Sequence, residues 1–61
     1  MQYKVECFDD NCWQHRVWKK SEIAADAMAA VESKSRHKAY RVMFQSKIIY
    51  QYDSKGNPIP F

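Results

Sequence analysis

The side chains best able to carry out chemistry are two cysteines and two histidines, Cys7, Cys12, His15 and His37. A cysteine beside a histidine can form a nucleophile and its general base, and four such ligands are of the kind that hold zinc. However, the spacing Cys-x4-Cys-x2-His with a distant second histidine matches no compact zinc motif. A local disulfide between Cys7 and Cys12 is a further alternative. We interpret both cysteines as packing thiols and expect no metal ion.

No sequence motif of an enzyme is present. Gly56 is the only glycine and lies near the C-terminus, so the chain has no glycine-rich loop for a phosphate. Nucleophile-elbow and His-Glu-x-x-His patterns are absent as well. Asp9 and Asp10 are adjacent carboxylates, but together with Asn11 they are typical of a turn. We therefore expect a protein that is not an enzyme and needs no cofactor.

The first part of the chain predicts a β-hairpin. Residues 3–8 begin with an apolar and polar alternation, residues 9–11 favour a turn, and residues 12–18 predict a returning strand. A three-residue loop at 9–11 places Cys7 opposite Trp13. In that register the core face carries Tyr3, Val5, Cys7, Trp13, His15 and Val17, and the outer face carries Lys4, Glu6, Phe8, Cys12, Gln14, Arg16 and Trp18.

One helix is predicted over residues 22–34. Ser21 is a favourable N-cap, and Glu22 and Asp26 place negative charge in the opening turns. At 100° per residue the apolar side chains fall within an arc of about 140°. This arc is the face that we expect to pack on the sheet, and it consists of Ile23, Ala24, Ala27, Met28 and Val31.

Residues 39–44 and 48–52 predict a second hairpin, with two registers left open because no glycine marks the turn. A three-residue loop at 45–47 places Tyr40, Val42, Phe44, Ile48, Tyr50 and Tyr52 on one face. A two-residue loop at 45–46 instead groups Ile49 with Tyr40, Val42 and Phe44.

The predicted elements form one α+β domain of order β-β-α-β-β over residues 1–55, followed by an extended C-terminal tail over residues 56–61. Four antiparallel strands with one helix on one face are the simplest way to bury these stripes, and the other face stays open. Aromatic residues, Arg and Met are enriched in interface cores. The side chains that we select for binding on the open face are Lys4, Arg16, Trp18, Arg41 and Met43.

Composition favours binding to another molecule. Aromatic residues make up 15% of the 61 positions, which is more apolar surface than one helix on a sheet can cover. The formal net charge of +3 is spread along the chain, whereas nucleic-acid domains usually cluster their cations. We expect protein–protein contacts, including a homodimer. A nucleic-acid-binding basic and aromatic sheet face is the alternative, and a small acidic ligand shared by two copies is a third possibility.

The chain has no apolar run long enough to cross a membrane. It also lacks the basic and then apolar order of a secretory signal at its start. We expect a cytoplasmic protein.

The alanine-rich segment SEIAADAMAAV at residues 21–31, followed by YRVMF at 40–44 and IIY at 48–50, resembles the short accessory proteins of bacteriophages. The resemblance extends over about residues 21–52 and contains no diagnostic motif. It implies a setting in the cytoplasm of an infected bacterium and a stoichiometric role, such as inhibition of a host or defence protein. These proteins share no common site, so the resemblance assigns no site residues.

Overall fold

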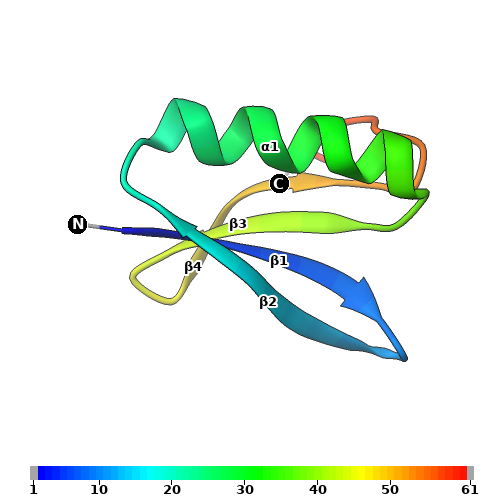
Figure 1. The fold of residues 1–61 in the computed structure, drawn as a ribbon, viewed down its shortest axis with the longest axis horizontal. Helices are drawn as coiled ribbons and strands as arrows, with labels where there is room; N and C mark the ends of the chain where they lie inside the picture. Colours follow the sequence, from blue (N-terminus) through cyan, green and yellow to red (C-terminus); the bar gives the residue numbers. More distant parts are fainter. Residues whose placement is uncertain (1, 61) are drawn as a thin grey trace.

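The computed structural model describes residues 2–60 of the chain and confirms the predicted α+β fold. Its elements are β1 (Tyr3–Asp9), β2 (Cys12–Lys19), α1 (Glu22–Arg36), β3 (Tyr40–Phe44) and β4 (Lys47–Tyr52). The strands form one antiparallel sheet of order β2-β1-β3-β4, so the two hairpins join through β1 and β3. α1 lies across one face of this sheet, and the tip of the β1–β2 hairpin extends away from it (Figure 1).

The core is small and lies between α1 and the two central strands. Val5 of β1 pairs with Val42 of β3, and Cys7 pairs with Tyr40. All four side chains are buried, and the Tyr40 ring is fully enclosed. Because these residues occupy alternate positions along their strands, they share the face on which α1 packs.

The first hairpin turns over two residues, so the prediction of a three-residue loop was wrong. Asp10 and Asn11 both have a left-handed backbone (φ 52° and 62°), as in a type I′ turn. Asp and Asn tolerate this conformation better than most residues do. Because the loop is shorter, Trp13 pairs with Phe8 and not with Cys7. Trp13 therefore lies on the face away from the helix, and its predicted place in the core was wrong.

Beyond a β-bulge in β2 the side chains again face as predicted, although their partners differ: Val5 was expected opposite His15, and Tyr3 pairs with Lys19 in place of Val17. Val5 pairs with Val17, whereas its neighbour Glu6 pairs with His15, which leaves Arg16 as the extra residue of the bulge. His15 accordingly shares a face with Glu6, and its predicted place in the core was also wrong. Val17 packs against the core as expected.

In the second hairpin, the two-residue turn is the alternative that the structure confirms. Gln45 and Ser46 form this turn, again with a left-handed backbone (φ 50° and 65°). A bulge follows in β4, with Ile49 as the extra residue. Because of this bulge, Tyr50 pairs with Val42 and Tyr52 with Tyr40, so both tyrosines pack against the core together with Ile49. The core face thus combines residues from both predicted registers.

Helix α1 has the predicted N-cap and continues slightly beyond the predicted end. The Ser21 hydroxyl accepts a hydrogen bond from the backbone N–H of Ala24 (3.3 Å). Lys34 and Arg36 in the last turn complement the helix dipole. The helix ends at Arg36, and the following residue, His37, caps it with a left-handed backbone (φ 57°).

The face that α1 turns to the sheet differs from the prediction. Ala25, Ala29 and Ser33 are fully buried, whereas Ile23 and Val31 are exposed. Ala24 and Ala27 are exposed as well, and only Met28 of the predicted apolar arc packs against the core.

The physical reason lies in three tyrosines of the sheet, each of which donates a hydrogen bond to a carboxylate of the helix. A buried phenol such as that of Tyr40 needs an acceptor for its hydroxyl, and the small side chains of Ala25 and Ala29 let the helix approach closely enough for its carboxylates to reach the tyrosines. We call this set of contacts the tyrosine clasp. Its pairs are Tyr40 with Glu32 (2.8 Å), Tyr50 with Glu22 (2.6 Å) and Tyr52 with Asp26.

The residues after β4 turn back along its outer edge. The Asp53 carboxylate accepts hydrogen bonds from the backbone N–H groups of Lys55 (2.8 Å) and Asn57 (3.0 Å). Ile59 then donates its N–H to the carbonyl of Gln51 in β4 (2.8 Å). Within residues 2–60, the segment that follows β4 therefore partly covers this sheet edge.

Candidate functional site on the open face of the sheet

The face of the sheet opposite α1 gathers the aromatic and charged side chains that the core does not use. Strand pairing places them together, because directly opposed residues share a face. Lys4 pairs with Trp18 and Met43, Glu6 with His15 and Arg41, and Phe8 with Trp13. We call this set the open face: Lys4, Glu6, Phe8, Trp13, His15, Trp18, Arg41 and Met43.

Glu6 is the electrostatic centre of the open face. Its carboxylate accepts a hydrogen bond from Arg41 Nε (2.6 Å) and lies 3.3 Å from Lys4 Nζ. Only 8% of Glu6 is exposed to solvent. Burial by itself would raise the pKa of Glu6, but the hydrogen bonds and positive charges of Arg41 and Lys4 outweigh it and hold the pKa below its usual value. Glu6 is therefore a carboxylate at neutral pH, and both cations are paired with it.

The aromatic rings surround this ion-pair cluster. The guanidinium carbon of Arg41 lies 4.2 Å from the centre of the Trp13 ring, and Phe8 meets the same indole edge-on at 5.3 Å. Lys4 Nζ lies 5.7 Å from the Trp18 ring, which also contacts His15 at 5.2 Å. These contacts fix the rings in place. They do not cover them, since 52% of Trp18 and 41% of Phe8 remain exposed to solvent.

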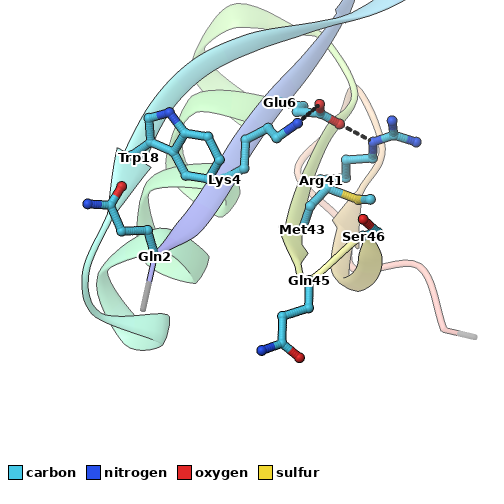
Figure 2. Close-up of a pocket in the computed structure, with 8 residues that line it drawn as sticks. All are labelled: Gln2, Lys4, Glu6, Trp18, Arg41, Met43, Gln45 and Ser46. Carbon is cyan, nitrogen blue, oxygen red and sulfur yellow. Dashed lines mark hydrogen bonds and ion pairs between the residues drawn. The ribbon is translucent and has the colours of Figure 1, made fainter.

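A pocket of about 420 Å³ lies on the open face between β2, β1 and β3. Figure 2 shows Glu6 between Lys4 and Arg41, with Trp18 beside Lys4 on the other side. Met43 and the β3–β4 turn border the pocket opposite Trp18. The complete lining is Gln2, Lys4, Glu6, Trp18, Arg41, Met43, Gln45 and Ser46.

The structure brings together four of the five residues that the sequence selects for binding. Lys4, Trp18, Arg41 and Met43 all line the pocket. Arg16 does not; it is exposed at the bulge of β2. The binding role of all five stays a prediction.

Sequence reasoning missed several members of this surface. Trp13 and His15 were assigned to the core because the first loop was predicted one residue too long. The signal that could have corrected this length is the pair Asp10-Asn11, which suits a two-residue type I′ turn. Glu6 was placed on the outer face, but its pairing with Arg41 across strands depends on how β1 meets β3. Gln45 and Ser46 carry no sequence signal for a pocket.

The cysteines and histidines do not converge. Cys7 and Cys12 are free thiols, the first buried and the second exposed. Within residues 2–60, no group of three His, Cys, Asp or Glu side chains is placed to hold a metal ion. In the same part of the chain, no helix is both long and apolar enough to cross a membrane.

Comparison with protein-family models, with curated proteins and with solved structures finds no match to this chain.

Proposed function

We propose that this protein acts by binding another protein through the open face of its sheet. The observation that carries the proposal is Trp18, a large side chain held in place beside the pocket and half exposed to solvent. Trp, Arg and Met are typical of the centres of protein interfaces, and hot spots cluster around such aromatic anchors. In line with the phage accessory proteins that the sequence resembles, the role proposed is stoichiometric inhibition of a host or defence protein in the bacterial cytoplasm.

The ion-pair cluster supports a protein partner over a phosphate backbone. Nucleic-acid affinity depends mainly on cations that neutralise phosphates, and the two central cations of the open face are already paired with Glu6. A phosphate placed there would also meet the negative charge of a carboxylate held below its usual pKa. Trp18 and Met43 offer apolar contacts to a protein partner, and these contacts do not require an unpaired cation.

The β3–β4 turn supports the same conclusion. Gln45 and Ser46 both line the pocket and both have a left-handed backbone, which costs about 1–2 kcal/mol for a residue with a β carbon. Strained residues of this kind cluster at functional sites. Two such residues beside the pocket fit a turn whose side chains meet a partner.

The test is affinity capture from bacterial lysate with the immobilised chain and two variants. Trp18→Ala is expected to weaken partner binding by about 2 kcal/mol or more, which is roughly 30-fold in Kd. Ile23→Ser is the matched control, because it also removes an exposed hydrophobic side chain but lies on the helix (82% exposed). A protein captured by the original chain and by the control, but not by Trp18→Ala, supports the proposal. Equal capture by all three contradicts it.

Self-association is a separate outcome of this test. Sedimentation of the purified chain over a range of concentrations measures it directly. A dimer that Trp18→Ala dissociates would show that a second copy occupies the open face, in place of another protein.

A second candidate function, binding of single-stranded nucleic acid, is favoured by one observation. The short first turn and the β2 bulge bring Trp13 and His15 to the open face beside Trp18, and aromatic side chains on a sheet are platforms for stacked bases. This function requires affinity for random single-stranded oligonucleotides that falls with salt at a log–log slope of about −0.7 per phosphate neutralised. Trp18→Ala should reduce that affinity.

A further inference from the structure

The outer surface of α1 carries an apolar stripe that the fold does not use. Among residues 2–60, Ile23 and Val31 are the most exposed large hydrophobic side chains, at 82% and 65%. Ala27, also exposed, lies midway between them at helical four-residue spacing, and Ala24 is exposed beside it. We call these four residues the outer stripe. Exposed apolar side chains that gather on one face of a helix are typical of an interaction surface.

The tyrosine clasp explains why this stripe faces outward. Helix α1 has three acidic residues, and each of them accepts a hydrogen bond from a tyrosine of the sheet. The charges that usually cover the solvent side of a surface helix therefore point toward the sheet. The outer stripe is left without a carboxylate, and the exposed residues Lys20 and Lys34 lie near its two ends.

A second copy of the chain is a poor occupant for this stripe. Ile23 and Val31 are only about 12 Å apart along the helix axis, whereas a stable interface usually buries about 800 Å² on each partner. Charged groups around the stripe must therefore contribute to binding. If two α1 helices paired antiparallel about Ala27, Lys20 of one copy would face Lys34 of the other. Parallel pairing would place each lysine against its own counterpart, so both arrangements bring like charges together.

The wider charge distribution points to an acidic occupant. Of the ten Lys and Arg residues, only Lys4, Lys38 and Arg41 form ion pairs within the described part of the chain. The cations at the ends of the outer stripe are not among these three.

We propose that the outer stripe binds a second, acidic partner protein that presents an apolar helical ridge with carboxylates at both ends. Ile23 and Val31 pack against the ridge, with Ala27 allowing close approach, and Lys20 and Lys34 pair with the carboxylates. This surface is on the opposite side of the molecule from the open face. The two surfaces can therefore be tested separately.

The probes are two designed amphipathic helical peptides with the same leucine stripe. One has glutamates on both sides of the stripe, and the other has lysines at those positions. Fluorescence anisotropy is expected to show binding of the acidic peptide alone. The double variant Ile23→Ser/Val31→Ser should weaken that binding at least tenfold, and Lys20→Ala/Lys34→Ala should remove most of its dependence on salt. Trp18→Ala is the matched control and should bind the acidic peptide like the original chain.

Several results would overturn this proposal. They are equal binding of both peptides, no binding of either, binding that survives the double variant, and binding that Trp18→Ala abolishes. A dimer in sedimentation that the double variant dissociates would show that a second copy covers the stripe. Because Ile23 and Val31 are exposed, the double variant should keep the fold and the thermal stability of the original chain, which circular dichroism checks.

Discussion

At the scale of single residues, Glu6 organises the open face. Its carboxylate pairs with Arg41 and Lys4, and these two side chains in turn contact Trp13 and Trp18. One buried acid thus holds two cations in place beside two indole rings. A binding surface whose side chains are fixed before the partner arrives loses less conformational entropy on binding.

Replacement of Glu6 tests this arrangement. Glu6→Gln removes the charge and keeps the shape, and at pH 7 it should destabilise the fold by about 1.5–3 kcal/mol, the scale of a hydrogen bond to a charged group. Since the folded state holds the pKa of Glu6 below its usual value, this stabilisation is present above the unfolded pKa of about 4.3 and is lost as pH falls through the folded pKa. Urea unfolding at pH 7 and near pH 3 should show the gap between the two proteins narrowing at acid pH. A constant gap would contradict the prediction.

The turn residues Gln45 and Ser46 provide a second test at this scale. Gln45→Asn/Ser46→Gly gives the turn a sequence suited to two left-handed residues, and should stabilise the fold by about 1–2 kcal/mol. If the original side chains contact the partner, the same variant should bind it more weakly although it is more stable. Thermal unfolding and partner binding measure the two effects. Asp10→Asn/Asn11→Gly is the control in the other hairpin, where binding should not change.

At the scale of elements, the orientation of α1 depends on the tyrosine clasp. Ala25 and Ala29 bury little area, so the contact between helix and sheet relies on the phenol rings and their hydrogen bonds. The clasp pairs are well separated along the helix, since Glu22, Asp26 and Glu32 lie on successive turns. They therefore fix the rotation of the helix about its axis as well as its distance from the sheet.

Tyr40→Phe should destabilise the protein more than a surface substitution does. The Tyr40 ring is fully buried, and its hydroxyl donates to Glu32 at 2.8 Å. Loss of a hydrogen bond to a charged acceptor costs about 1.5–3 kcal/mol. Denaturant unfolding measures the change, and Glu32→Gln, which retains an acceptor, should cost less. If Tyr40→Phe were as stable as the original chain, the clasp would not be what holds the helix.

The elements show where prediction from the sequence succeeds and where it does not. Alternation, capping and turn residues predict the β-β-α-β-β order because these signals are local. The helix face was assigned by hydrophobicity alone, which ignores the need of buried tyrosine hydroxyls for acceptors. Arg16 and Ile49, the extra residues of the two bulges, were not foreseen, because a bulge depends on how whole strands twist and pair. Lys4 and Met43 share the open face as expected, because β1 pairs with β3 without a bulge and these two residues are directly opposed.

At the scale of the whole molecule, the acidic groups are mostly engaged within the fold. Within residues 2–60, six of the seven acidic side chains form an ion pair or accept a hydrogen bond. Their partners are a cation, a tyrosine hydroxyl or a backbone N–H. Most cations have no such partner. A net charge of +3 therefore understates how basic the accessible surface is, and this favours acidic partners.

The same arrangement predicts how the whole fold responds to alkaline pH. Burial and the hydrogen bond to Asp26 raise the pKa of Tyr52 to about 12, and burial and Glu32 raise the pKa of Tyr40 further. Because the folded state retains these protons more tightly than the unfolded chain does, the stabilisation is complete below the unfolded pKa of about 10 and is lost as pH rises through the folded values.

The free energy of unfolding should consequently fall steeply between about pH 10 and 12, and ultraviolet absorbance of tyrosinate should appear together with loss of helical circular dichroism. Tyr52→Phe removes one of these groups and should make the fall shallower, although the variant starts from a lower stability at pH 8. Lysines also lose their charge in this range, so Lys38→Met, which removes the ion pair with Asp9, serves as the control and should leave the slope nearly unchanged. The chain has a fourth tyrosine, Tyr3, outside the clasp. If more than one tyrosinate formed near pH 10 while the helical signal persisted, the clasp hydroxyls would not be bonded to the helix, and the clasp would not determine the orientation of α1.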